Sequence, residues 1–382
     1  MLQTFPMQDL TDFLDPLQID LLMDDNGLTD GQIGKHIRIY DSEFPSLESI
    51  DIVFIGIPEN RGEQPGTGLH LGPDQIRKQL YTLHYWHEDV TLADLGNIKK
   101  GAELSDTYAA VKTVLAEMLR LNKTVVLIGG SHDLTLAQYE AYKTLEQTVD
   151  VTCVDAAIDL RGESTKRSEN FLLDMLTVEP NLVKHYNHIA FQSYLLHPRM
   201  IETMDKLRFD CYRVGLVQDK LEEMEPVIRN TNMLSFDISA IRNSDSPASR
   251  LSPNGLFGPE ACTLVRYAGM SNNLSSLGLY GYYPSLDRDD LSAKQVAQMI
   301  WYFIDGKNKS NQEAELNERD QFNEFHTVFA EVDTLFLQSK KTTRWWMQMP
   351  DRKFIACSQN DYIQASHNQI PERWLRVQER GF

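Results

Sequence analysis

The sequence predicts an α/β protein built around a mainly parallel, twisted sheet. From Asp51 onward, short apolar runs alternate with amphipathic segments, which is the pattern of repeated strand–helix units. Several apolar runs are followed at once by Gly, His or Asp, as at the carboxyl edge of a parallel sheet, where ligands bind. These observations favour three layers, with helices on both faces of the sheet.

The apolar runs and the segments between them define the expected elements. Strands are expected at residues 52–57, 125–128, 151–154, 188–192, 211–216, 233–236, 277–280 and 328–332. Helices are expected at residues 72–83, 105–121, 134–145, 198–207, 259–268 and 292–304. Pro73 suits the first turn of the first helix, and Ser105 suits the N-cap of the second, which supports these two starts.

The chain is predicted to form one domain with an extension at each end. Residues 1–50 are acidic and weakly periodic, so we expect an N-terminal extension there. Residues 51–340 carry the repeating pattern without a linker rich in Pro, Gly or Ser, so we expect one α/β domain, with a solvated polar loop at residues 307–321. Residues 341–382 mix Trp and Met with charges, and we expect this extension to pack on the body.

The composition argues against several classes of function. The chain has 382 residues, of which 42% are hydrophobic, and this is enough for a sizeable core. Its formal net charge of -18 disfavours nucleic acids and anionic membranes as partners. No apolar run is long enough to span a bilayer and the N-terminus lacks a signal-peptide charge pattern, so we expect a cytoplasmic protein. The four cysteines form no C-x-x-C pair, which argues against a zinc knuckle.

Three segments place polar side chains directly after an apolar run. His132 follows a Gly pair, Asp155 and Asp159 follow the third run, and Asp237 follows the sixth. Taken singly, such a His is usually a hydrogen-bonded loop residue and such an Asp is usually a helix N-cap. Together, three carboxylates and an imidazole would meet at one edge of the sheet, where a divalent cation would relieve the repulsion between the carboxylates. The mixed nitrogen and oxygen ligand set suits Mn, Fe or Zn better than Ca.

These segments resemble the three motifs of the ureohydrolases, the family of arginase, agmatinase and formimidoylglutamase. The family motifs are G-G-D-H-S, D-A-H-x-D and S-x-D-x-D, and the chain has GGSHD at 129–133, DAAID at 155–159 and SFDIS at 235–239. Residues 56–77 and 254–261 resemble further family segments, so the resemblance covers about residues 50–340. It implies an arginase-type α/β/α fold, with formimidoylglutamase the most similar of the enzymes.

Ureohydrolases hold two manganese ions with six side chains. The resemblance therefore implies a metal centre here, but one in which the ligands of only one ion are complete. The ligands of one ion fall on His132, Asp155, Asp159 and Asp237. The other ion would share Asp155 and Asp237 and add a His and an Asp, but those two positions are Ala157 and Ser239. Two shared carboxylates are too few for a manganese shell, so we expect at most one divalent transition metal, Mn, and no second ion.

Three outcomes are open for this centre. One metal could bind and still activate water, as in single-metal hydrolases. The site could instead be structural or regulatory, with hydrolysis lost. In the third outcome no metal binds, and the carboxylates are satisfied by water or by Arg161 and Arg242. A deacetylase of related fold is disfavoured, because its site depends on a D-x-H pair whose second member here is Ala157.

The predicted function is that of a formimidoylglutamase-like hydrolase whose two-metal cleavage of a C–N bond is weak or absent. If the chain is an enzyme, Asp155 would be catalytic, and Glu331, which resembles a late family glutamate, would contact a small cationic amidine or guanidine. The family also implies a homo-oligomer. The alternative is a non-catalytic binding or scaffold protein, with the N-terminal extension and Trp345, Trp346 and Trp374 as partner surfaces.

Overall fold

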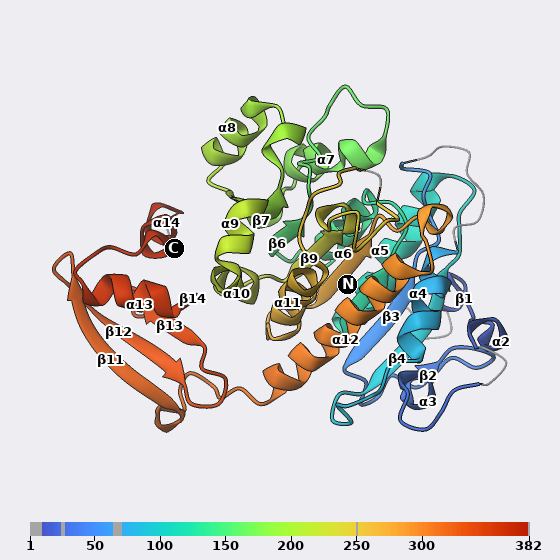
Figure 1. The fold of residues 1–382 in the computed structure, drawn as a ribbon, viewed down its shortest axis with the longest axis horizontal. Helices are drawn as coiled ribbons and strands as arrows, with labels where there is room; N and C mark the ends of the chain where they lie inside the picture. The colour runs from blue at the N-terminus through green and yellow to red at the C-terminus, as the bar shows by residue number, and fades with distance from the viewer. Residues whose placement is uncertain (1–9, 24–26, 64–70, 250, 381–382) are drawn as a thin grey trace.

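The computed structural model describes residues 10–23, 27–63, 71–249 and 251–380. Figure 1 shows two parts, which we call the body (residues 10–311) and the C-terminal module (residues 312–380). The body is a large sheet covered by helices, and the C-terminal module is a small sheet with two helices beside it. The long helix α12, Leu291–Asn311, leads from one part to the other.

The body contains a sheet of ten strands among the described residues, in the order β1-β4-β3-β5-β10-β9-β6-β7-β8, with β2 also paired to β4. All of these pairs are parallel except β1 with β4, which confirms the predicted mainly parallel sheet. The strands are β1 Leu14–Asp15, β2 Arg38–Ile39, β3 Ile52–Gly56, β4 Leu92–Ile98, β5 Thr124–Ile128, β6 Val149–Val154, β7 Val183–Phe191, β8 Asp210–Arg213, β9 Met233–Asp237 and β10 Ser276–Tyr280.

Helices cover both faces of this sheet, so the predicted three layers are present (Figure 1). Alternate residues of β5 enter opposite cores: Val126 and Ile128 pack with α4, α11 and α12, whereas Val125 and Leu127 pack with α5, α6 and α7. The body helices are α2 Ile19–Leu22, α3 Ile33–His36, α4 Gly72–Tyr81, α5 Leu104–Arg120, α6 Leu134–Thr144, α7 Phe171–Thr177, α8 Pro198–Lys206, α9 Val214–Asp219, α10 Met224–Arg229, α11 Gly258–Gly269 and α12.

Two features of the sheet differ from the sequence prediction. The pattern does not predict β4, because its sequence LADLGNI includes polar residues. Its Asp94 is nevertheless fully buried, and the pairing of its carboxylate with the buried Arg77 at 2.8 Å makes that burial tolerable. The strand expected at 211–216 is also wrong in its extent, since β8 ends at Arg213 and α9 begins at Val214.

The predicted N-terminal extension is part of the body where the structure describes it. β1 and β2 both pair with β4, and Leu10, Leu14 and Leu47 are buried in the core. Strands of two residues are too short to show a periodic pattern, which is why the sequence does not reveal them. Residues 1–9 and 24–26 of the predicted extension lie outside the described residues.

The C-terminal module corrects the predicted boundary at residue 340. Its antiparallel sheet consists of β11 Phe322–Phe329, β12 Val332–Ser339, β13 Trp345–Gln348 and β14 Phe354–Cys357, followed by α13 Gln359–Ser366 and α14 Glu372–Arg380. The predicted boundary therefore falls inside one sheet, between β12 and β13. The polar segment at 307–321 is only partly a loop, because α12 continues to Asn311. Of the charged residues in this segment, Lys309 is exposed on the helix and Lys307 is half-buried.

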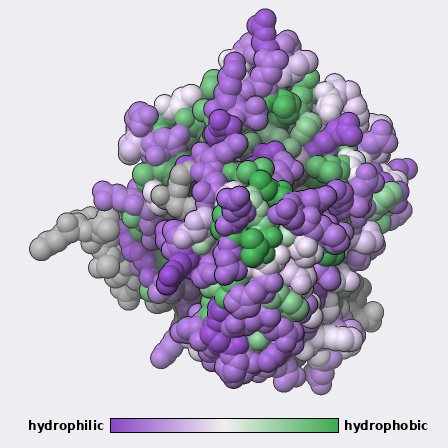
Figure 2. All heavy atoms as spheres, turned by 90° about the vertical axis from the view of Figure 1, so that its left-hand side faces the viewer, coloured by the Kyte–Doolittle hydropathy of each residue, from purple (hydrophilic) through white to green (hydrophobic). Residues whose placement is uncertain are grey.

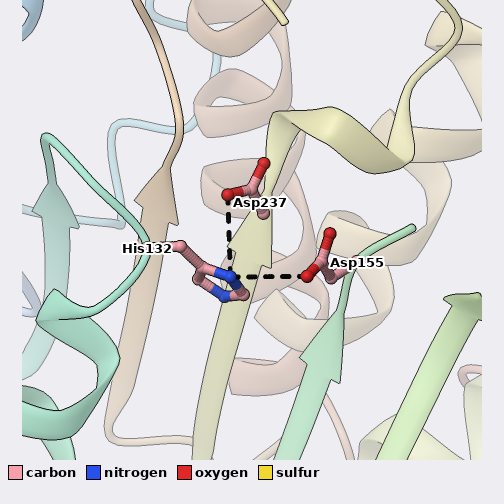
Figure 3. Close-up of side chains that lie close together, drawn as sticks. All are labelled: His132, Asp155 and Asp237. Atoms are coloured by element: carbon pink, nitrogen blue, oxygen red, sulfur yellow. Dashed lines mark ion pairs between the residues drawn. The ribbon is translucent and has the colours of Figure 1, made fainter. Parts of the chain in front are cut away.

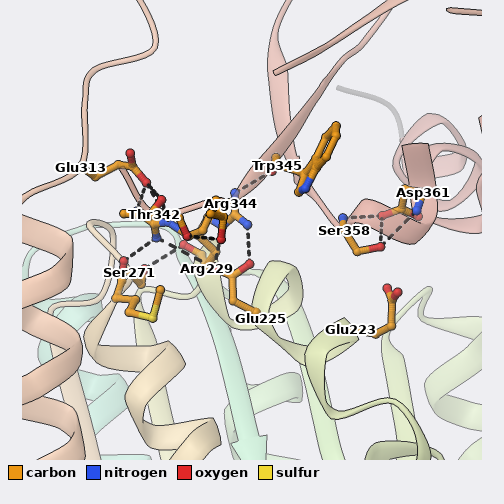
Figure 4. Close-up of polar contacts among 12 residues, drawn as sticks. Glu223, Glu225, Arg229, Ser271, Glu313, Thr342, Arg344, Trp345, Ser358 and Asp361 are labelled. Atoms are coloured by element: carbon orange, nitrogen blue, oxygen red, sulfur yellow. Dashed lines mark hydrogen bonds and ion pairs between the residues drawn. The ribbon is translucent and has the colours of Figure 1, made fainter. Parts of the chain in front are cut away.

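The module and the body are joined by two arginines that each reach across the boundary (Figure 4). Arg229 of α10 donates to the backbone oxygen of Trp345 at 2.7 Å, while Arg344 beside β13 donates to the backbone oxygen of Met270 at 2.7 Å. Each guanidinium is also paired with a carboxylate of its own part, Arg229 with Glu225 and Arg344 with Glu313. Residues 341–382, where described, thus contact the body through buried, charge-assisted bonds.

The three tryptophans of the C-terminal tail are buried or partly buried. Trp345 and Trp346 are only 6% and 8% exposed, and Trp374 is partly buried in the aromatic core of the module. The exposed tryptophan is Trp86, at 74%, which the sequence analysis does not single out. Within the described part of the chain, none of the helices is both long and apolar enough for a membrane crossing.

Candidate metal centre

The four predicted ligands follow three strands that end at the same edge of the sheet. His132 lies in the loop after β5, Asp155 and Asp159 follow β6, and Asp237 ends β9. Because these strands belong to the continuous run β5-β10-β9-β6 and point the same way, their carboxyl ends meet. The position is the one that the sequence predicts for a ligand site.

Two glycines allow the loops to approach closely enough to build this edge. A Cβ on Gly130 would lie 1.6 Å from the backbone oxygen of Glu59, so only glycine fits where the loop leaves β5. Gly281, after β10, has φ of +81°, and a Cβ there would lie 2.5 Å from a carboxylate oxygen of Asp237. The space around Asp237 therefore depends on the absence of a side chain on the neighbouring strand.

The imidazole of His132 is the point at which the carboxylates converge (Figure 3). Its Nδ1 lies 3.1 Å from Asp159 Oδ2, 3.5 Å from Asp155 Oδ2 and 3.6 Å from Asp237 Oδ2. The ligand atoms of His132, Asp155 and Asp237 all lie within 4.8 Å of one another, a separation that allows them to share one metal ion. The structure thus brings all four predicted metal ligands together.

Burial makes this cluster of charges costly unless a cation is present. His132 and Asp155 are each only 3% exposed, and Asp159 is 8% exposed. Burial and the charge of Asp155 raise the pKa of Asp237 to about 6, although the nearby His132 acts against them. Burial alone would lower the pKa of His132, but Cys153 and the carboxylates around the ring raise it well above its usual value. The geometry therefore stabilises positive charge at Nδ1, either a proton or a metal ion.

A second group of side chains holds the His132 ring in place. Ser235 Oγ lies 3.0 Å from Nε2 and is itself hydrogen-bonded to Thr135 Oγ1 at 2.6 Å. Phe171 packs edge-on against the ring, with 4.8 Å between the ring centroids. With Nε2 engaged by Ser235, Nδ1 is the ring nitrogen that faces the carboxylates. The sequence shows Ser235 only as a motif residue and gives no role to Thr135 or Phe171, because their contacts depend on the fold.

The opposite side of the shared carboxylates is occupied by Ser239. Its hydroxyl donates to Asp155 Oδ1 at 2.5 Å, and its backbone N–H donates to Asp237 Oδ1 at 2.7 Å. Each shared carboxylate therefore presents Oδ2 to His132 and Oδ1 to Ser239. The nearby Ala157 has no donor atom. The residues present fit one metal ion on the His132 side and do not fit a second ion on the Ser239 side.

Glu331 is not part of this centre, so its predicted role is wrong. It lies exposed in the turn between β11 and β12, where Ala330 and Glu331 both have positive φ, of 48° and 63°. The predicted strand at 328–332 spans the end of β11, this hairpin turn and the start of β12, on the separate sheet of the C-terminal module. Glu331 lies beyond residues 50–305, the part of the chain that the family model matches.

The two predicted arginine partners are also placed elsewhere. Arg161 pairs with Glu169 at 3.5 Å, and Arg242 pairs with Asp245 at 2.9 Å. Neither ion pair includes a residue of the metal centre, so these arginines do not balance its carboxylates in the way that the third outcome requires. Residues 64–70 of the glycine-containing segment that resembles the family's first loop lie outside the described residues.

Comparisons with known proteins agree with this architecture. A model of the arginase family, described as "Arginase family", matches residues 50–305, well over half of the chain. A formimidoylglutamase of Staphylococcus haemolyticus is 24% identical over 262 residues, which cover 65% of this chain and 82% of that protein. The matched region lies within the body and stops before the C-terminal module.

Solved structures show the same fold. Formiminoglutamase of Trypanosoma cruzi with Mn²⁺ superposes with a TM-score of 0.66 at 20% identity and covers 73% of this chain and 99% of its own. Formimidoylglutamase of Bacillus subtilis superposes with a TM-score of 0.64 at 18% identity and covers 72% of this chain and 92% of its own. The predicted arginase-type fold and the predicted resemblance to formimidoylglutamases are confirmed.

Proposed function

The chain belongs to the arginase family, and from this we propose that it is a formimidoylglutamase-like relative in which one metal position is kept and the other is lost. The observation that carries the proposal is the division of the shared carboxylates. Asp155 and Asp237 each turn one oxygen toward His132 and the other toward Ser239. One side of the centre is thus a ligand set, and the other side is closed by hydrogen bonds.

The donor set of the kept side fits one divalent transition metal, and Mn²⁺ is the ion that we propose. It would be held by His132, Asp155, Asp159 and Asp237. When bound, such an ion supplies Lewis-acid chemistry, which lowers the pKa of water and stabilises developing negative charge. Ser235 orients His132 for this task, and Ser239 orients Asp155 and Asp237.

The proposed substrate class is a small cationic amidine or guanidine, whose C–N bond would be hydrolysed. The net charge of -18 and the carboxylates at the centre favour a cation over an anion. Asp155 is the proposed catalytic residue, because it alone contacts both His132 and the Ser239 hydroxyl. Turnover should be weak or absent, because one ion supplies less stabilisation of charge than two ions that share a bridging position.

The test is a count of metal ions together with an assay of hydrolysis. After loading with Mn²⁺ and dialysis, elemental analysis of the purified chain should give one ion per chain. Formimidoylglutamate, arginine and agmatine should give no fast release of formamide or urea. Two ions per chain, or turnover at ordinary enzyme rates of roughly 1–1000 per second, would contradict the proposal.

A matched pair of variants shows whether the counted ion occupies this centre. Asp159→Asn removes one ligand at the carboxyl edge and should lower the metal content sharply. Asp150→Asn changes an aspartate of β6 near the opposite edge of the sheet, where its carboxylate pairs with Lys184 at 3.6 Å, and should leave the metal content unchanged. Equal metal content in the two variants would mean that the ion binds elsewhere.

A non-catalytic binding protein is the second candidate function. It is favoured by the hydrogen bond from Ser239 to Asp155, which occupies the oxygen that would face a second metal ion, and by the burial of Asp155. In that case a guanidinium compound such as agmatine should raise the melting temperature of the metal-loaded chain without being consumed. Consumption of the ligand would favour the hydrolase, and no thermal shift would remove support for this candidate.

A further inference from the structure

Strand β11 is a long and unprotected edge of the small sheet. It forms eight consecutive pairs with β12 without a register shift, and it is the outer strand of the order β11-β12-β13-β14. Its sequence FNEFHTVF contains no Lys, Arg or Pro and no bulge, the features that usually block pairing at an edge. The other edge strand, β14, lies against α10 of the body, so β11 borders the module on the side away from the body (Figure 1).

We propose that β11 joins two copies of this chain, by antiparallel pairing of the two β11 strands about a two-fold axis centred on Phe325. A two-fold dimer uses the same surface on both subunits, so the surface must be complementary to itself. Pairing of two β11 strands would merge the small sheets into one continuous sheet and would satisfy the outward backbone groups of both edges. This inference is independent of the proposed hydrolase function.

The two faces of β11 limit the registers that are available. Phe325 and Thr327 face α13: the ring of Phe325 packs at a tilt against Tyr362 with 5.1 Å between ring centroids, and Thr327 donates to the backbone oxygen of Ala365 at 3.3 Å. Glu324, His326 and Val328 point to the other face and are exposed. A two-fold axis perpendicular to the merged sheet keeps each face of β11 on its own side of that sheet. Neighbouring residues point to opposite faces, so the axis must place one residue opposite its own copy rather than opposite a sequence neighbour.

Of the three central positions, only Phe325 gives a favourable register. An axis through Glu324 would place two glutamates directly opposite each other, and an axis through His326 would place Glu324 opposite the apolar Val328 of the second copy. An axis through Phe325 places Glu324 of each copy opposite His326 of the other copy, so this pair forms twice. Glu324 is already held by Arg319 of its own chain at 2.9 Å, which fixes its carboxylate on this face.

The same register covers an exposed apolar side chain. Val328 is 60% exposed near the end of β11, and the register places it opposite Phe322 of the second copy, whose side chain is only 3% exposed in its own module. Figure 2 views the molecule from the side of the C-terminal module and shows a largely hydrophilic surface with apolar side chains gathered near its middle. The exposed large apolar residues of the module are Val328, Ile363, Ile370 and Leu375. A second copy is the occupant that this self-complementary strand selects.

The experiment measures mass in solution by light scattering for the full chain and two variants. The unmodified chain should contain at least a two-chain unit at micromolar concentration. His326→Glu places like charges opposite each other at two positions and should halve the mass of the assembly. The double variant Glu324→Lys with His326→Glu places opposite charges at these two positions and should restore the mass. Both positions are exposed, so circular dichroism should be unchanged.

A cysteine pair tests the register directly. Glu324→Cys with His326→Cys should give a covalent dimer on mild oxidation, because these positions oppose each other across the axis at a separation suited to a disulfide. The unmodified chain, whose four cysteines are native, serves as the control. A monomeric unmodified chain, a mass unaffected by His326→Glu, or a double-cysteine variant that forms no more covalent dimer than the control would each overturn the proposal.

Discussion

The two sides of the centre share the carboxylates of Asp155 and Asp237 but differ in the groups that face those carboxylates. On one side, His132 and Asp159 complete a ligand set around the shared carboxylates of Asp155 and Asp237. On the other side, Ser239 donates two hydrogen bonds to those carboxylates, and Ala157 contributes no polar atom. The comparison shows that a buried carboxylate can have one oxygen facing a cationic group and the other satisfied by a hydroxyl or a backbone N–H.

The largest expected effect comes from removing His132, a ligand on the side of the centre that we propose still binds a metal ion. His132→Ala leaves three buried carboxylates without their cationic partner, so the chain should lose its metal ion and about 3–5 kcal/mol of unfolding free energy. Metal analysis and urea unfolding measure both effects. The control is His185→Ala. His185 lies in the amino-terminal half of β7 and its imidazole pairs with Asp210, so this variant should keep the ion. Full metal content in His132→Ala would show that His132 is not a ligand.

Rebuilding the lost side is the next largest change. Ala157→His combined with Ser239→Asp supplies the two ligands that the family motifs have at these positions, so the metal content should rise from one ion to two per chain. Either change alone leaves the second position one ligand short and should leave the count at one. A double variant that still binds one ion would show that the spacing of the second side has changed along with its residues.

A smaller effect should follow from removing a side chain that orients His132 while keeping all four proposed ligands. Ser235→Ala deletes the hydroxyl that lies 3.0 Å from His132 Nε2, so the ring loses its orienting partner. Changes of this kind typically weaken metal binding about 10–100-fold. Titration with Mn²⁺ followed by calorimetry measures the loss. The stoichiometry should stay at one, and an unchanged affinity would mean that Phe171 packing alone orients the ring.

The smallest effect should follow from a change on the lost side. Ser239→Ala removes the hydroxyl bond to Asp155 Oδ1 but keeps the backbone bond to Asp237. Stability should fall by about 1–3 kcal/mol, the typical cost of leaving a buried acceptor unpaired. Metal content should not rise, because alanine adds no ligand. A gain of a second ion in this variant would show that Ser239 blocks the position rather than merely failing to fill it.

The sequence predicted the sheet and the convergence of His132, Asp155, Asp159 and Asp237, because both depend on local pattern. The residues after β5, β6 and β9 belong to strands that are apolar along most of their length, and parallel strands bring their carboxyl ends together. Strand β4 escaped prediction because Asp94 makes it look polar, and only the fold supplies Arg77 as its partner. The placement of Glu331 failed for a different reason, since the turn between β11 and β12 lies beyond residues 50–305, the part of the chain that the family model matches.

The sequence alone does not reveal what Ser239 contacts. The motif comparison shows that an aspartate is missing there, whereas the two hydrogen bonds to Asp155 and Asp237 appear only when β6 and β9 lie side by side. Likewise, the edge strand β11 is recognisable only from the strand order of the small sheet. Contacts between segments distant in the sequence are therefore the part of the site that pattern alone did not supply.

The most direct test of the central claim is anomalous diffraction from crystals of the chain grown with Mn²⁺. The account predicts a single manganese peak surrounded by His132, Asp155, Asp159 and Asp237, with Ser239 still hydrogen-bonded to Asp155. Two manganese peaks bridged by Asp155 and Asp237 would contradict it, and so would the absence of any peak at saturating metal concentration.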